Sequence, residues 1–274
     1  MGMRLNTPGK LNRFGKRITP SISRLVANAR ATSLIELASS YLHCVIGKGG
    51  GSNWHLGEEI AASQFILRRD PVIMDIGANQ GWWTIGLRKL LEGRGRWILV
   101  DPAAECCKVL RQIEGVEVIE AAVGERKGRV KFYTPGDGSG FASLHKRHDS
   151  HVRMGNLVLE EREVEMTTID EILEERGIEL VDMAKMDLEG HELFALRGAA
   201  RSLEAHRIRS LTFEIGTANV DSRTFFRDYF DLLTGYGYQI RRIYPGGKTV
   251  PILEYYEDLE YFRGATNYIA TVET

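Results

Sequence analysis

The chain has 274 residues, of which 43% are apolar, enough for one large α/β domain with an appendage but not for two catalytic domains. Its formal net charge of -1 gives no overall field toward polyanions, so we predict no nucleic-acid partner. The three cysteines suit reduced thiols better than a disulfide framework, and no apolar run reaches the roughly 18 residues of a membrane span. The start also lacks the apolar block of a secretory signal, so we expect a cytoplasmic protein without a transmembrane segment.

The N-terminal part is basic. The first 35 residues carry seven Lys and Arg residues and no acidic residue, which favours contact with an anionic membrane face or a partner protein. An organelle transit peptide and a solvated start with little order are the alternatives. Across residues 22–45 apolar side chains recur at spacings of three and four, which predicts an amphipathic helix, interrupted once, that docks on something. The glycine-rich stretch 47–53 ends any helix, so we divide the chain into a helical appendage, 1–56, and a main domain, 57–274.

In the main domain short apolar runs alternate with helical patterns, which is typical of parallel strands joined by crossover helices. The predicted strands are 72–76, 97–100, 116–121, 181–186 and 211–215. The predicted helices are 82–91, 104–113, 169–176, 191–203 and 225–235. Two more strands, 238–243 and 268–272, are expected to close the sheet with antiparallel pairing. The pattern predicts a doubly wound α/β fold with a mostly parallel sheet.

A glycine turn follows the first predicted strand. The strand ends in Asp75, and Gly77 and Gly81 let the chain turn and bring its backbone close to a ligand at the start of the next helix. A dinucleotide site would favour glycine at position 79 and a third glycine near the start of the helix, so Asn79 disfavours a diphosphate. S-adenosylmethionine has no phosphate, and its cationic groups suit the carboxylate of Asp75. An ordinary structural turn is the alternative.

The second and third strands add features of a nucleoside site. Asp101 ends the second strand, where a carboxylate can accept both ribose hydroxyls of either NAD or S-adenosylmethionine, and Pro102 then turns the chain. Ala121 and Ala122 follow the third strand and are small enough to lie against an adenine ring. Small residues at a tight packing point would give the same pattern.

Carboxylates follow the fourth and fifth strands. Asp187, Glu189 and Glu214 should converge at the carboxyl edge of the sheet if these strands are neighbours. They can include a general base for a hydroxyl nucleophile, or they can hold a divalent cation that lowers the pKa of that hydroxyl. Alternatively, Glu189 and Glu192 only favour the start of a helix.

A glycine-rich and then cationic stretch, 135–148, is expected to form a mobile loop that closes over the site. The histidines in and beside it, His145, His148 and His151, do not have the spacing of a metal site. His145 is a further candidate for the base.

Together these segments resemble the FkbM family of methyltransferases over about residues 57–274. The matching stretches are VIMDIGANQGWWT, WILVDPAAE, GFASL, MTTIDEILEE, VDMAKMDLEGHELFALRGA, LTFEIG and GATNYIA. The resemblance implies a class I methyltransferase fold with seven strands in the order 3-2-1-4-5-7-6. It also implies methylation of hydroxyl oxygens, on sugars of surface polysaccharides or on polyketide natural products.

The resemblance places the methionine moiety near Asp75 and Gly77, and the ribose near Asp101. The family usually has Glu at the last of these positions, so the shorter Asp101 implies a ribose contact through a water. The predicted cofactor-binding residues are Asp75, Gly77, Ala78, Asn79, Gly81, Trp82, Asp101, Pro102, Ala121, Ala122 and Asp187. The candidates for the base are, in order, Asp187, Glu189, Glu214 and His145. A divalent cation is conceivable there, but none is predicted.

The sequence therefore predicts an S-adenosylmethionine-dependent O-methyltransferase that acts on a sugar or glycan hydroxyl. The alternatives are a polyketide or small-molecule O-methyltransferase, an NAD-dependent oxidoreductase, and a non-catalytic scaffold in glycan assembly. Residues 1–56 lie outside the resemblance and get no function from it; contact of their basic arm with a membrane surface or a glycosyltransferase is an alternative to a solvated start with little order.

Overall fold

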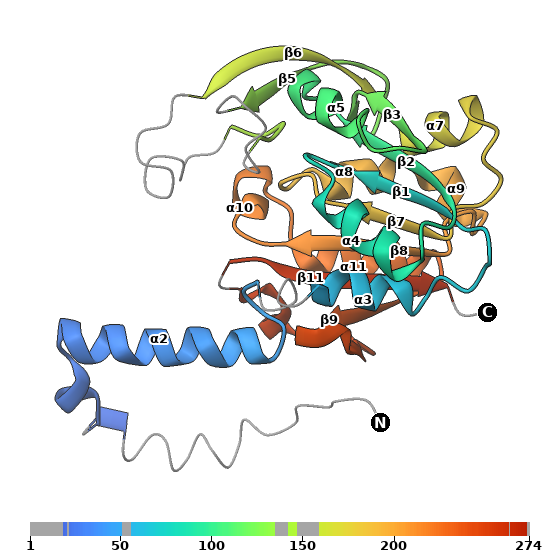
Figure 1. Cartoon of the computed structure of the whole chain (residues 1–274). Helices are drawn as coiled ribbons and strands as arrows, with labels where there is room; N and C mark the ends of the chain where they lie inside the picture. The colour runs from blue at the N-terminus through green and yellow to red at the C-terminus, as the bar shows by residue number, and fades with distance from the viewer. Residues whose placement is uncertain are drawn as a thin grey trace.

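The computed structural model describes residues 19–20, 22–50, 56–134, 142–146, 159–262 and 264–272. A sheet of eight strands, in the order β10-β9-β11-β8-β7-β1-β2-β3, runs through the centre of the molecule (Figure 1). In chain order its strands are β1 (Val72–Ile76), β2 (Arg96–Asp101), β3 (Val116–Glu120), β7 (Met183–Met186), β8 (Ser210–Ile215), β9 (Tyr238–Ile243), β10 (Thr249–Pro251) and β11 (Thr266–Val272).

Seven of these strands confirm the predicted order 3-2-1-4-5-7-6. Strands β3, β2, β1, β7 and β8 are parallel, and β11 pairs antiparallel with both β8 and β9. The eighth strand, β10, corrects the seven-stranded expectation; it has three residues, one of them Pro251, and so gives no strand pattern. Because β11 reverses direction between them, β8 and β9 point the same way. The end of β9 therefore lies at the edge where β1, β2, β7 and β8 end, which is the edge that carries the predicted site.

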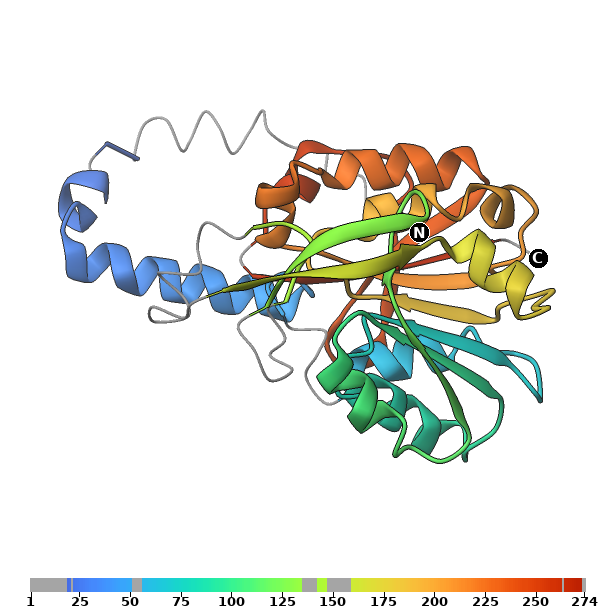
Figure 2. The ribbon, with the colours of Figure 1, turned by 90° about the horizontal axis from the view of Figure 1, so that it is seen from above.

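Helices cover both faces of the sheet, as the view from above shows (Figure 2). Side chains of α3 (Gly57–Ser63), α4 (Trp82–Leu90) and α5 (Ala104–Leu110) pack on one face against Ile73 and Leu99. On the other face lie helices α7 (Ile169–Glu175), α8 (Glu192–Arg197), α9 (Ala200–Glu204) and α11 (Phe226–Gly235). Successive side chains of a strand point to opposite faces of the sheet, so each buried strand packs against both sets of helices.

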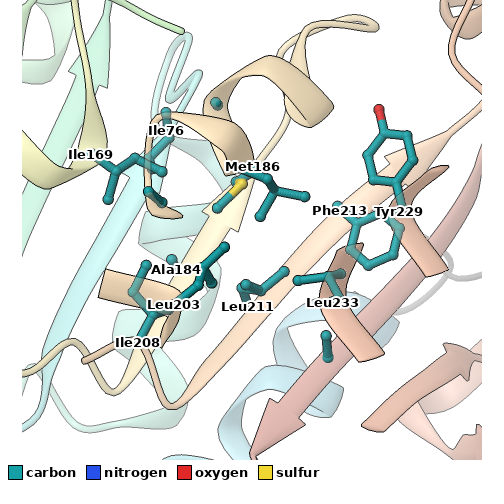
Figure 3. Packing of buried hydrophobic residues seen from close by; sticks show 14 of the residues in the cluster. Ile76, Ile169, Ala184, Met186, Leu203, Ile208, Leu211, Phe213, Tyr229 and Leu233 are labelled. Carbon is teal, nitrogen blue, oxygen red and sulfur yellow. The ribbon is translucent and has the colours of Figure 1, made fainter. Parts of the chain in front are cut away.

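The larger core lies between the sheet and the second set of helices. In Figure 3 the side chains of Ile76, Met186 and Phe213 gather with those of the covering helices. Phe213 also stacks on Tyr229 of α11, with ring centroids 5.1 Å apart. This packing fixes the ends of β1, β7 and β8 relative to one another, and with them the predicted site.

A second, three-stranded sheet was not predicted. Its strands are β4 (Ala122–Val123), β5 (Gly128–Thr134) and β6 (Glu160–Thr167), in the order β4-β6-β5 (Figure 1, top). Much of the β5 and β6 pairing is made by exposed charges, such as Lys131 with Glu161 at 2.7 Å and Arg129 with Glu163 at 3.2 Å. Strands held by cross-strand ion pairs lack the apolar pattern that identifies buried strands.

The predicted helix 191–203 is wrong in one respect, because it is divided into α8 and α9 at Gly198. A Cβ at Gly198 would lie 2.0 Å from the carbonyl oxygen of Gly124, so backbones meet here. Two short elements at the carboxyl side were also missed, the helix α10 (Ala218–Ser222) and the 3-10 turn η3 (Glu257–Glu260). A third, the 3-10 turn η2 (Pro245–Gly247), follows β9.

The N-terminal helix α2 (Ala29–Val45) follows a helical segment at 22–26, which confirms an amphipathic pattern interrupted once. Within the described chain α2 buries no residue and extends away from the sheet in both views (Figures 1 and 2), so its expected docking on a partner stays a prediction. The chain reaches the domain just beyond it, where Lys48 donates to the carbonyl of Asp258. No described helix is both long and apolar enough to cross a membrane.

Burial predicts opposite outcomes for two leucines. We expect Leu211→Ala, in β8 with no exposed surface, to lower the free energy of unfolding by about 2–5 kcal/mol because it leaves a cavity. Leu37→Ala, on α2 with 69% of its surface exposed, should change it by less than about 0.5 kcal/mol. Urea unfolding followed by circular dichroism measures both. A loss for Leu37→Ala as large as that for Leu211→Ala would show that α2 does pack on the domain.

Candidate active site

The turn after β1 is held against two neighbouring strands. Gly77 has φ +80°, and a Cβ there would lie 1.9 Å from the carbonyl oxygen of Asp187. The N–H groups of Gly77 and Ala78 both donate to the carbonyl of Val100, at 2.8 and 3.1 Å. A side chain at position 77 would therefore separate β1 from the end of β7. The glycine brings the turn and Asp187 together.

Gly81 has the turn conformation that was predicted, and it also has a packing role that was not. It has φ +78° and begins α4, where an added Cβ would lie 2.8 Å from Ile113 and 3.0 Å from Leu110. Its missing side chain lets α4 pack closely on the region of α5, and the residue lines neither of the two hollows described below.

Asp75 is also placed behind the surface of the site. Its side chain has no exposure, accepts a 2.6 Å hydrogen bond from the hydroxyl of Thr84, and lies 3.6 Å from the ammonium of Lys185. The prediction put this carboxylate against the cofactor, but it lines neither hollow. The contacts give Asp75 a supporting role, in which it holds the first turn of α4 and the Lys185 side chain.

The first hollow, which we call the apolar hollow, has a volume of about 740 Å³ with the solvent at its mouth included. Asp101 stands in its wall, with one carboxylate oxygen 2.8 Å from the N–H of Asn79 and the other 2.8 Å from the N–H of Ala103. Burial raises the pKa of Asp101 to about 6, while these two hydrogen bonds lower it. Most of the remaining wall is apolar and includes Val100, Pro102, Cys106, Ala121, Ala122, Val123, Phe132, Ala142 and Leu144.

The second hollow, which we call the polar hollow, has a volume of about 630 Å³, again with open solvent included. It is lined by Glu58, Glu59, Gly77, Ala78, Asn79, Trp82, Trp83, Lys185 and Asp187. Sequence reasoning missed Glu58, which accepts hydrogen bonds from Thr212 at 2.9 Å and Asn267 at 3.3 Å. Burial raises the pKa of Glu58 to about 7. The acidic pair at the start of α3 was the available signal, but nothing in its spacing pointed to β8 and β11.

Lys185 is the other residue that sequence reasoning missed. Burial alone would lower the pKa of Lys185, but the carboxylates of Asp187, Asp75 and Glu58 raise it, so the ammonium stays charged. Its nitrogen lies 3.2 Å from Asp187. A lysine inside a buried apolar strand was a signal for this position, because such a charge needs partners.

Asp187 lies where the two hollows meet. Gly77, Asn79 and Asp187 line both of them, and the Asp187 side chain is 41% exposed. Glu189 lines the apolar hollow. Glu214 lines neither hollow; burial raises its pKa, and the charges of Asp187 and Glu189 raise it further.

The predicted candidate His145 pairs with a second histidine. Its Nε2 lies 3.0 Å from Nδ1 of His191, and His191 in turn stacks on Phe194. Burial lowers the pKa of His145, and it lowers that of His191 to about 3, so both rings are neutral near pH 7. His191 lines the apolar hollow, whereas His145 lies behind it. His148 and His151 fall outside the described residues, as does most of the predicted loop 135–148.

The arrangement fits one elongated ligand better than two separate ones. A ring and a ribose fit the apolar hollow with Asp101, and a charged end fits the polar hollow between Glu58 and Lys185. Within the described ranges, no group of three or more His, Cys, Asp or Glu residues is placed to hold a metal ion.

Comparison with known proteins agrees with this geometry. The family model for the methyltransferase FkbM domain matches residues 75–240. The 2-O-methyltransferase NoeI of Sinorhizobium fredii (strain NBRC 101917 / NGR234) is 31% identical over 155 residues, which is 50% of this chain but only 61% of NoeI. The crystal structure of methyltransferase FkbM from Methylobacillus flagellatus KT shares the fold, with a TM-score of 0.51 at 17% identity, and the match covers 95% of this chain and 60% of that one. Because the family model covers more than half of the sequence, the chain belongs to the FkbM methyltransferase family.

Proposed function

We propose that the protein transfers the methyl group of S-adenosylmethionine to a hydroxyl oxygen of a sugar or glycan. The observation that carries this proposal is the meeting of the apolar and polar hollows at Asp187. A cofactor that lies across both hollows has its sulfonium centre at their junction. An acceptor hydroxyl that approaches this junction also approaches the Asp187 carboxylate.

The residues present fit the parts of this cofactor. Asp101 accepts from the ribose hydroxyls, and the alanines 121 and 122 lie against the adenine. The methionine ammonium and carboxylate lie in the polar hollow, near Glu58 and Lys185 respectively. When bound, S-adenosylmethionine supplies an electrophilic methyl group. The missing third glycine and the side chain of Asn79, which lines both hollows, disfavour the diphosphate of NAD.

The chain contributes position and a proton acceptor. Asp187 takes the proton from the acceptor hydroxyl, and Lys185 at 3.2 Å orients this carboxylate. Glu189 is the second candidate because it lines the apolar hollow. Glu214 and His145 rank below them, since neither lines a hollow. Much of the rate should come from alignment of the hydroxyl with the methyl group.

The acceptor class rests on the relative. NoeI is named as a 2-O-methyltransferase, and its 31% identity supports transfer to oxygen in this chain too. A sugar hydroxyl is our proposal for the acceptor, with a small-molecule hydroxyl as the competing class. Location in the cytoplasm and contact of the basic arm with a membrane or a glycosyltransferase remain predictions.

Asp101→Asn tests the ribose contact. The amide keeps the shape of the side chain but loses the charge and one acceptor oxygen, so we expect the dissociation constant of S-adenosylhomocysteine to rise about 10- to 100-fold. Isothermal titration calorimetry measures it. The matched control is Glu120→Gln. Glu120 is the residue of β3 that pairs with Asp101 of β2, but its carboxylate forms an ion pair with Arg111 and lines neither hollow. Equal binding by both variants would overturn the assignment of the apolar hollow.

The pH dependence of binding gives a second test. Because burial raises the pKa of Asp101 to about 6, this carboxyl is protonated below that pH and can no longer accept both ribose hydroxyls. We expect S-adenosylhomocysteine to bind more weakly as the pH falls through about 6. The free energy of unfolding has the opposite pH dependence. Because the pKa of Asp101 is higher in the folded chain than in the unfolded chain, its contribution to stability decreases as the pH rises toward 6. Asp101→Asn should remove this step, and a wild-type affinity that is level between about pH 5 and 8 would contradict it.

Asp187→Asn tests the proton acceptor. We expect kcat to fall by about 100-fold or more, while the affinity for S-adenosylhomocysteine changes by less than about tenfold. Transfer of labelled methyl groups to a panel of sugars and oligosaccharides measures kcat. Glu189→Gln is the comparison; if it loses more activity than Asp187→Asn, Glu189 is the base instead.

A further inference from the structure

A buried arginine near the other end of the sheet has no acidic partner among the described residues. Arg242 lies in β9 with 7% of its surface exposed, and among the described residues no carboxylate forms an ion pair with it. Its guanidinium donates to the hydroxyl of Tyr256 at 2.8 Å and to the carbonyl of Ile46 at 3.5 Å, while Nε is buried without a partner. A buried charge with only neutral partners is costly, and an anion would relieve that cost.

A second cation lies near this arginine. Lys48 is 5% exposed and donates to the carbonyl of Asp258. Burial lowers the pKa of Lys48, the charge of Arg242 lowers it further, and the Asp258 carboxylate opposes them. Two shielded cations therefore lie in one region of the fold, although Lys48 does not line the hollow described next.

A small hollow opens beside Arg242. Its volume is about 350 Å³ with open solvent included, and its polar lining comes from Arg242, Tyr244, Tyr256 and Glu254. The guanidinium carbon lies 6.0 Å from the centre of the Tyr244 ring. The tyrosine hydroxyls can donate hydrogen bonds to an oxyanion. Glu254 is exposed and is the one carboxylate of the lining, so it would repel an anion unless it turns to solvent.

The part of the hollow formed by Arg242 and Tyr244 lies toward the same edge of the sheet as the proposed active site, whereas the part near Ile252 lies beside Ile240, earlier in β9. Arg242 is the residue before the last of β9, and β9 ends at the edge where β7 leads into Asp187. Three strand intervals separate β7 from β9, through β8 and β11. At about 4.8 Å for each interval, the two positions are roughly 14 Å apart. A single sugar ring is shorter than this separation, so an acceptor that contacts both positions would have to be extended.

We propose that the hollow at Arg242 binds an oxyanion, a carboxylate or a phosphate, that is carried by the acceptor. The planar guanidinium matches either group. The identity of this group as part of an acceptor rests on the proposed function, but anion binding itself does not. The chain therefore selects an extended, anionic glycan-like substrate rather than a neutral monosaccharide.

Thermal unfolding of the full chain tests the site with simple anions. Ligands that bind only the folded state raise the midpoint, so we expect inorganic phosphate or galacturonate to raise it more than chloride at equal ionic strength. Phosphate acting alone would identify a phosphate site, and galacturonate acting alone a carboxylate site. No increment with either anion would overturn the proposal.

Neighbouring arginines provide a matched control. Arg242→Gln should lose the anion-specific increment, whereas Arg241→Gln should keep it, because Arg241 lies over the Phe65 ring and lines no part of this hollow. If Arg242→Gln fails to fold, Tyr256→Phe removes one hydroxyl and should weaken anion binding several-fold. An increment that survives in Arg242→Gln, or unchanged anion affinity in Tyr256→Phe, would contradict the site.

Binding of S-adenosylhomocysteine to wild-type protein separates the two proposals. If it binds and the anion increment is absent, the anion site fails and the proposed function stands. If the increment is present and S-adenosylhomocysteine does not bind, the proposed function fails and the anion site remains.

Discussion

The close contact between Gly77 and the backbone of Asp187 determines the geometry of the site. With a Cβ, residue 77 would lie 1.9 Å from the carbonyl oxygen of Asp187, so the turn after β1 can reach β7 only as glycine. Both residues line both hollows. The same turn donates two hydrogen bonds to the carbonyl of Val100 at the end of β2, which places Asp101 at the apolar hollow. The ends of the parallel strands β1, β2 and β7 therefore lie together at the site.

The distribution of charge makes the apolar hollow and the polar hollow two different environments. On one side Asp101 stands in a mainly apolar wall, away from Asp187 and Glu189 at the junction, which suits a nucleoside. On the other side Lys185 lies among Asp75, Asp187 and Glu58, and their attraction keeps it charged in spite of burial. A fixed lysine also restricts Asp187, whose side chain would otherwise turn freely at the exposed junction. The buried Asp75 contacts both Lys185 and Thr84, so it holds the lysine and the first turn of α4 in place.

The cofactor half of the site could be predicted because its signals are local. A strand that ends in an acid and a glycine turn occupies a few consecutive residues, and β1 has the bounds 72–76 that the pattern predicted. The position of Glu58 could not be predicted in this way, because it depends on contacts with Thr212 and Asn267, 154 and 209 residues away. Strand β6 was missed for another reason, since its charged residues face solvent and hide the apolar period. Gly81 and Asp75 line neither hollow, and this too could not be predicted, because a motif shows which residues lie near a ligand but not which of them face it.

The antiparallel end of the sheet carries the proposed anion site. Strand β9 shares its direction with the parallel strands only because β11 runs antiparallel between β8 and β9. That reversal places Arg242 toward the active edge and leaves β10 as a short outer strand. The connection from α2 also meets the domain here, where Gly47 lies against the carbonyl of Ile243 and Lys48 reaches Asp258. An anion held by Arg242 would therefore lie beside the attachment of α2. This contact lies close to the end of β9. A partner that binds the exposed face of α2 would therefore act near the acceptor side of the site. Strand β2, which carries Asp101, lies toward the other end of the sheet.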